Sequence, residues 1–156
     1  MLPPKKILVP VDADVDADRD LARNLVDAAA DLANAFDARV RLVHVAPPVA
    51  MLGAEQSSAS YRAMLEVLEQ KNVAAQHTLD ALKTRLTDRA LACDSELLTE
   101  AGSVPEIVVR AAQHYDADLI VVASHGRRGV ARIVLGSVAE RTAHLSPIPV
   151  LLLPPG

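Results

Sequence analysis

The residues best suited to chemistry lie in an apolar run and the loop that follows it. Residues 118–126 read Asp-Leu-Ile-Val-Val-Ala-Ser-His-Gly, and Gly136-Ser137 come after nine further residues. Glycine allows close approach of backbone to a bulky ligand, and a helix opening at Ser137 would direct unpaired N–H groups and partial positive charge outward. The intervening loop holds Arg127, Arg128 and Arg132, although the net charge of the chain is −4. This combination predicts an anion site, for the phosphates of a nucleotide.

Each of these residues also has a purely structural interpretation. Gly126 and Gly136 could be ordinary turn glycines. Ser137–Glu140 reads Ser-Val-Ala-Glu, a capping box in which the serine would cap the last helix. Ser124 and His125 could simply close the turn. The place of the glycines, after an apolar strand and before a helix, favours ligand binding, and arginine matches phosphate oxygens bidentately, so we expect at least one loop arginine near the phosphates.

Asp12 is the second candidate, because it directly follows the first apolar run, residues 5–11. It is either one of several solvated acids or a hydrogen-bond partner for a ribose hydroxyl or a bound metal ion. His44 and His125 match no zinc spacing, so the metal ligands remain unassigned. The phosphate-loop, dinucleotide and nucleophile-elbow motifs are missing. No base, nucleophile or carboxylate pair identifies a reaction, so no catalytic residue is assigned.

Strands and helices alternate along the chain. Apolar runs predict strands at residues 5–11, 39–45, 91–100, 118–123 and 148–153, and spacings of three and four predict helices between them, including a long one from 61 to 86. The alternation predicts one α/β domain over residues 1–156, an open parallel sheet with helices on both faces. Such sheets bind ligands at the carboxyl ends of strands, where the strand order reverses. Asp12 and the loop from Ser124 to Ser137 would meet there if the first and fourth strands are neighbours.

Composition narrows the class of protein. Apolar residues make up 51% of the 156 residues but aromatic ones only 2%, so the core must consist of Val, Leu, Ile and Ala. An acidic chain poor in aromatics is a poor match for a nucleic-acid partner. The single cysteine, Cys93, excludes an internal disulfide and is expected to be a small buried hydrophobe. No signal-like segment is seen, and no apolar run approaches the roughly 18 residues of a membrane span, so we expect a cytoplasmic protein without membrane insertion.

The sequence resembles the universal stress protein family, of the nucleotide-binding, UspA-like kind. The resemblance covers nearly the whole chain: KKILVPVD at the start, VRLVHV in the second strand, and DADLIVVASHGRRGVARIVLGSVAERTAHLSPIPVLLL at the end. The ATP-binding pattern of the family, G-x2-G-x9-G-[ST], aligns with Ala123-Ser-His-Gly126, nine residues and Gly136-Ser137. Alanine therefore replaces the first glycine and adds a methyl group where backbone approaches ligand.

The resemblance implies a ligand and a set of contacts. The ligand would be ATP, or ADP or AMP, with Mg²⁺ or Mn²⁺ at the phosphates. The β- and γ-phosphates would lie against Ser124, His125, Gly126, Gly136, Ser137 and Val138. The ribose and adenine would contact Pro10, Val11, Asp12 and the backbone at Val45, with Val122 and Ala123 lining the other wall.

The resemblance also implies an assembly and a function. The sheet would have the order 3-2-1-4-5, and a homodimer would form through the fifth strand, Ile148–Leu153. Pro149 and Pro154 are compatible with a strand at the edge of the sheet. The expected function is that of an ATP-binding stress-response protein, in which nucleotide occupancy or dimer state signals to a protein partner. One alternative is slow ATP hydrolysis or phosphoryl transfer at the same site. The other is a nucleotide-independent adaptor for a transporter or kinase, which Ala123 alone favours.

Overall fold

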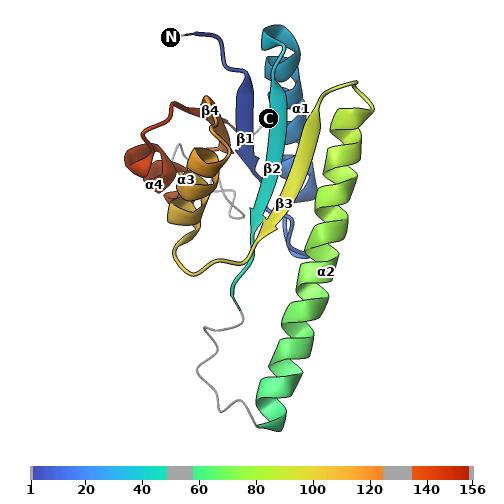
Figure 1. The fold of residues 1–156 in the computed structure, drawn as a ribbon. Coiled ribbons are helices and arrows are strands. Elements are labelled where there is room, and N and C mark those ends of the chain that lie inside the picture. Colours follow the sequence, from blue (N-terminus) through green and yellow to red (C-terminus); the bar gives the residue numbers. More distant parts are fainter. Residues whose placement is uncertain (1, 49–57, 125–134, 155–156) are drawn as a thin grey trace.

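A computed structural model describes residues 2–48, 58–124 and 135–154. Its centre is a parallel sheet of five strands in the order β3-β2-β1-β4-β5, as expected. The strands are β1 (Lys6–Pro10), β2 (Arg39–Val45), β3 (Cys93–Leu98), β4 (Leu119–Ala123) and β5 (Val150–Leu153). The helices are α1 (Arg19–Phe36), α2 (Ala59–Thr87), α3 (Val104–His114) and α4 (Ser137–Leu145), and Figure 1 shows their arrangement.

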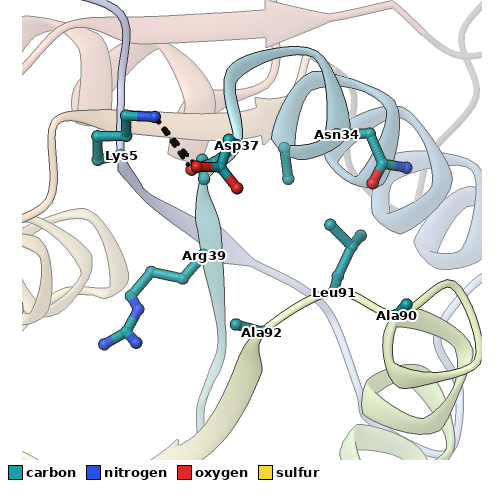
Figure 2. A pocket seen from close by; sticks show the side chains of 9 residues that line it. Lys5, Asn34, Asp37, Arg39, Ala90, Leu91 and Ala92 are labelled. Carbon is teal, nitrogen blue, oxygen red and sulfur yellow. Dashed lines mark hydrogen bonds and ion pairs between the residues drawn. The ribbon is translucent and has the colours of Figure 1, made fainter.

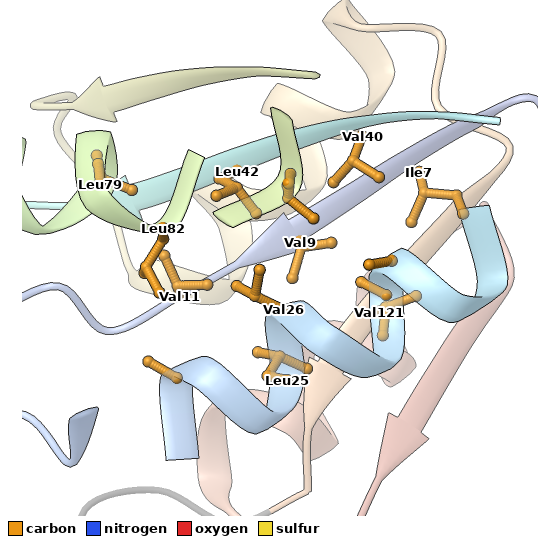
Figure 3. Packing of buried hydrophobic residues seen from close by; sticks show 14 of the residues in the cluster. Ile7, Val9, Val11, Leu25, Val26, Val40, Leu42, Leu79, Leu82 and Val121 are labelled. Atoms are coloured by element: carbon orange, nitrogen blue, oxygen red, sulfur yellow. The ribbon is translucent and has the colours of Figure 1, made fainter. Parts of the chain in front are cut away.

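Alternation along the strands divides the core between the two faces of the sheet. Ile7, Val9 and Leu42 belong to the cluster under α1 and α2, which Figure 3 shows. Leu8 and Val43, their neighbours in sequence, belong to the cluster under α3 and α4. Because successive residues of a strand point to opposite faces and both faces of this sheet are covered, the interior positions of β1 are all buried, which explains why β1 reads as an unbroken apolar run.

The helices over the first face are fixed by local signals and by ion pairs. The Asp18 carboxylate caps α1 by accepting from the N–H groups of Asp20 (3.0 Å) and Leu21 (3.1 Å). Arg85 of α2 donates to both carboxylate oxygens of Asp27 in α1 at 2.7 Å. The N-terminal part of α2 extends beyond the strands (Figure 1). The buried residues of α2 are Leu68, Ala75, Leu79, Leu82 and Leu86.

The first helix over the second face is fixed by a capping box. The Ser103 N–H donates to the Glu106 carboxylate at 3.0 Å at the start of α3. In α4, Thr142 is fully buried, and its hydroxyl has no hydrogen-bond partner among the described residues. Within the described ranges, no helix is long and apolar enough to cross a bilayer.

Candidate functional site

The strand order reverses between β1 and β4, and the described residues of the predicted site lie at or near the ends of strands β1, β2 and β4 or at the start of α4. β1 pairs with β4 through Ile7↔Leu119 and Leu8↔Ile120, and with β2 on its other side. The carboxyl ends of β1 and β4 therefore lie next to each other at one edge of the sheet. In open parallel sheets, ligands usually bind in a crevice outside the carboxyl ends of strands at such a point.

The strand ends present a mixture of buried and accessible groups at this crevice. Val11 (5% exposed) and Val122 (3% exposed) turn their side chains into the core, so only their backbones can face a ligand. Pro10, Val45 and Ala123 are half-buried, and Asp12 is exposed. The predicted residues His125, Gly126, Arg127 and Arg128 lie outside the described residues.

The loop that follows β4 is closed by hydrogen bonds at its described ends. The N–H of Ser124, which is 8% exposed, donates to the carbonyl oxygen of Leu153 at 2.7 Å. The carbonyl oxygen of Ser124 in turn accepts from the Gly136 N–H at 2.6 Å. The two ends of the glycine motif are thus held together, and the start of α4 is fixed beside the end of β4.

Helix α4 begins at Ser137, as the sequence predicts, but its cap is the preceding residue. Gly136, with φ −61° and ψ 144°, is the N-cap, and its carbonyl accepts from the Glu140 N–H at 2.9 Å. The interpretation of Ser137 as the N-cap is therefore wrong, because the carbonyl of the preceding residue, Gly136, accepts the first intrahelical bond. Ser137 and Val138 are exposed in the first turn, where backbone N–H groups have no acceptor within the helix. Such N–H groups suit an anion.

Asp12 is held in place by its neighbours. Its side chain is exposed, whereas Val11 and Ala13 on either side are buried, and its Oδ1 accepts from the Asp14 N–H at 3.1 Å. The Ala13 N–H lies 3.1 Å from Nδ1 of His44, a side chain only 8% exposed. From the sequence, His44 is a candidate only for a metal ligand. Its alternation with Val40 and Leu42 predicts the face on which it lies, but no pattern predicts its contact with residue 13.

A cleft of about 400 Å³ adjoins Asp12 between α1 and α2. Arg19 and Arg23 on α1 and His77 on α2 line it together with Asp12 and Asp14. The cleft therefore places the guanidinium groups of Arg19 and Arg23 near Asp12 and Asp14. Among the described residues, no group of three His, Cys, Asp or Glu could hold a metal ion without help from a ligand.

A second cavity, of about 440 Å³, lies at the opposite edge of the sheet, where β1 and β2 begin (Figure 2). Lys5 is engaged there, because its Nζ donates to the carbonyl oxygens of Phe36 (2.8 Å) and Asp37 (3.3 Å) and pairs with the Asp37 carboxylate at 3.5 Å. This lysine therefore provides hydrogen bonds to backbone carbonyl groups at the C-terminal end of α1, which have no partner within the helix. The cavity therefore has a structural explanation and is remote from the strand ends that form the predicted site.

The outer strand β3 carries an ionic cluster. Arg41 of β2 donates to both oxygens of Asp94 in β3, at 2.7 and 2.8 Å, and lies 3.7 Å from the Glu96 carboxylate. Its guanidinium carbon is 4.3 Å from the ring centre of Tyr115. The hydrogen bonds that Arg41 donates to Asp94 raise the pKa of Arg41, and burial raises the pKa of Tyr115. These groups are mutually satisfied, so the cluster stabilises the β3 edge.

Comparison with known proteins agrees with this architecture. The profile of the universal stress protein family matches residues 3–154. A relative, the universal stress protein MJ0531 of Methanocaldococcus jannaschii, is 30% identical over 149 residues, which cover 96% of this chain and 81% of that protein.

Solved structures show the same fold. UspA from Lactobacillus plantarum matches with a TM-score of 0.75 at 21% identity, covering 96% of this chain and 97% of that one. A universal stress protein from Archaeoglobus fulgidus in complex with dAMP has a TM-score of 0.66 at 22% identity (97% and 98% covered). A family protein from Arabidopsis thaliana with AMP bound has a TM-score of 0.65 at 18% identity (98% and 93% covered). The chain described here belongs to the universal stress protein family.

Proposed function

We propose that the protein binds an adenine nucleotide, ATP in the first place, in the crevice between the ends of β1 and β4. The observation that carries the proposal is the Ser124–Gly136 hydrogen bond of 2.6 Å, which fixes the N-terminus of α4 beside β4. The exposed Asp12 stands at the end of the neighbouring strand β1. The helix end that would bind phosphate therefore lies beside the end of β4, and the carboxylate that would bind ribose lies at the end of the adjacent strand β1. The AMP and dAMP complexes of structural neighbours support this assignment.

Each group in the proposal has a distinct role. The first turn of α4, with Gly136, Ser137 and Val138, would bind phosphate through backbone N–H groups. Asp12 would accept a hydrogen bond from a ribose hydroxyl, and the backbones of Val11 and Val45 would contact the base. Mg²⁺ or Mn²⁺ would be held mainly by phosphate oxygens and water, as is usual for Mg²⁺ at nucleotides. A helix end contributes only about 0.3–1 kcal/mol, so we expect micromolar affinity built from many such contacts.

The proposal is tested by calorimetric titration of ATP with Mg²⁺, and of ADP and AMP, into nucleotide-stripped protein. Gly136→Val should weaken binding about tenfold or more, a loss of about 1.4 kcal/mol, because it adds a branched side chain where phosphate approaches backbone. The φ of −61° allows valine at this position without backbone strain. Ala143→Val is the matched control, since it adds β-branched bulk to an exposed position of the same helix. Absence of binding by folded wild-type protein would count against nucleotide binding and favour the adaptor function. Equal binding by the two variants would instead refute the role of the α4 N-terminus as the phosphate site.

We further propose that β5 is the homodimer interface. The two edges of the sheet differ: β3 bears Asp94 and Glu96, whereas β5 reads Val-Leu-Leu-Leu and its residues are only half-buried. An apolar edge strand is a site for pairing, and a charged edge opposes it. In the parallel ladder, the N–H groups of Ile120 and Ser124 donate to the carbonyl oxygens of Pro149 and Leu153, so these two residues of the β5 segment face β4. Because backbone polar groups alternate in direction along a strand, those of Val150 and Leu152 point outward.

Sedimentation equilibrium tests this interface. Leu152→Pro removes an outward N–H without removing a bond to β4, so it should convert a wild-type dimer into a folded monomer. Glu96→Lys on the opposite edge is the control and should leave the dimer intact. A wild-type monomer, or a dimer that survives Leu152→Pro and dissociates with Glu96→Lys, would refute the assignment.

A further inference from the structure

We propose that His44 is a positioning residue that orients Asp12 toward the ribose, so that the site selects nucleotides carrying both ribose hydroxyls over their deoxy forms. This inference rests on the proposed function, because it concerns the same crevice. His44 itself is buried and need not touch the nucleotide. It acts through the backbone that carries Asp12.

The backbone on both sides of Asp12 is held by two successive residues of β2. The Val11 N–H donates to the Val43 carbonyl oxygen at 2.9 Å, which extends the β1–β2 ladder by one residue. The Ala13 N–H donates to His44 Nδ1 at 3.1 Å. Asp12 lies between these two attachments, so its Cα has little freedom relative to the sheet. Its exposed carboxylate is turned away from the buried side chains of Val11 and Ala13.

The hydrogen-bond chemistry of His44 explains why a histidine serves at this point. To accept from Ala13, Nδ1 must be unprotonated and the ring proton must be on Nε2. The same Nδ1 lies 3.1 Å from the Val11 carbonyl oxygen, so a ring protonated at Nδ1 would donate there and release the Ala13 N–H. Ala13 is fully buried and its N–H would then lack water as a substitute partner.

The orientation of the carboxylate depends on the same attachment. Asp12 Oδ1 accepts from the Asp14 N–H at 3.1 Å, and Asp14 directly follows Ala13. Loss of the His44 acceptor would therefore move both the backbone of Asp12 and the donor that orients its side chain. A hydrogen bond between a hydroxyl and a carboxylate is directional, and a bond to a charged group changes affinity by about tenfold or more.

The test compares His44→Leu with His44→Asn. Leucine fills much of the ring volume but has no acceptor, whereas the Oδ1 of asparagine can occupy nearly the place of Nδ1 at the cost of a smaller side chain. Dissociation constants are measured calorimetrically for AMP, 2′-deoxy-AMP and 3′-deoxy-AMP. We expect wild type to prefer AMP over at least one deoxy form by about tenfold. His44→Leu should reduce this preference to about threefold or less, and His44→Asn should keep it.

Two further measurements separate positioning from general damage. Urea unfolding ranks the variants by stability, and a purely structural role would make the loss of preference follow the loss of stability rather than the loss of the acceptor. In an Asp12→Ala background, His44→Leu should not change the preference further, because residues that act through one another are not additive.

The inference is overturned if His44→Leu retains the wild-type preference, if both substitutions reduce it equally, or if wild type binds AMP and its deoxy forms alike. All three results would leave nucleotide binding intact as a proposal. Failure of folded wild-type protein to bind any of the three nucleotides would overturn the proposed function together with the inference.

Discussion

Replacement of Thr142 by valine should stabilise the fold. Thr142 lies one turn after Ala139 in α4, on the side of the helix that packs toward α3, and its side chain is fully buried. Its hydroxyl has no hydrogen-bond partner among the described residues. Valine has the same shape, and it replaces a polar group that has lost its water by a methyl group that gains from burial.

The size of the effect follows from the burial. A buried hydroxyl without a partner costs about 1–3 kcal/mol in mutational data. Threonine and valine have similar helix propensities, so the helix itself contributes little to the difference. We therefore expect the free energy of unfolding to rise by about 2 kcal/mol, which for a chain of this length corresponds to an increase in Tm of about 4–8 °C.

Urea unfolding measured by circular dichroism checks this expectation. The midpoint for Thr142→Val should increase while the slope stays unchanged, which identifies a change of stability rather than of the unfolded state. Thr142→Ser keeps the hydroxyl and removes a methyl group, so it should lower stability by about 1 kcal/mol. A valine variant that is no more stable than wild type would refute the reasoning, since it would mean that the hydroxyl has a hydrogen bond.

Two further predictions concern titratable groups. The hydrogen bond from Arg85 lowers the pKa of Asp27, so this pair stabilises the fold above the pKa of an unfolded aspartate, about 4, and the contribution is lost as pH falls through the lower folded value. Asp27→Asn should therefore cost about 0.5–1 kcal/mol at pH 7, since both side chains are more than a third exposed, and the cost should shrink as the pH falls through the folded pKa; a deficit that stays the same at all acid pH values at which the protein is folded would contradict this. Burial raises the pKa of Cys93, so iodoacetamide at pH 8 should alkylate it more slowly in the folded protein than in 8 M urea, and equal rates measured by mass spectrometry would show that the thiol is accessible.

The fold was largely predictable because its signals are local. The strand at residues 39–45 was predicted with its observed bounds, since Val40, Leu42 and Val43 are buried on alternating faces. The ends of other strands depended on their neighbours. β3 stops at Leu98 rather than at residue 100, because its partner β2 ends at Val45, which pairs with Leu98.

Tertiary contacts also explain two other differences. β5 begins at Val150 rather than Ile148, because the Ser146 hydroxyl accepts from the Ile148 N–H (3.0 Å) and donates to its carbonyl (2.7 Å). A ranking by hydrophobicity would place Phe36 on the core face of α1, but Phe36 is 36% exposed, whereas alanines such as Ala29 and Ala33 are fully buried. Small residues let the helix approach the sheet closely, which a ranking by hydrophobicity does not predict.

The candidate site was predictable only in outline. The strand order and the place of Asp12 after β1 follow from the pattern of strands and from the resemblance. The N-cap at Gly136 depends on a hydrogen bond to Ser124, twelve positions earlier in the sequence, and the contact of His44 with Ala13 joins two different strand ends. Neither contact has a fixed spacing, so neither could be read from the sequence.

The position of β1 determines the order in which the protein can assemble. β1 is first in the sequence, yet one of its partners is β4, through Ile7↔Leu119 and Leu8↔Ile120. Pairing between such distant segments is slow, because a long loop must close first. A nascent chain can therefore pair β1, β2 and β3 while the apolar edge of β1 stays open until residue 119 has left the ribosome. The crevice between β1 and β4 is completed only when this pairing forms, so a nucleotide bound there would stabilise the finished sheet and none of its precursors.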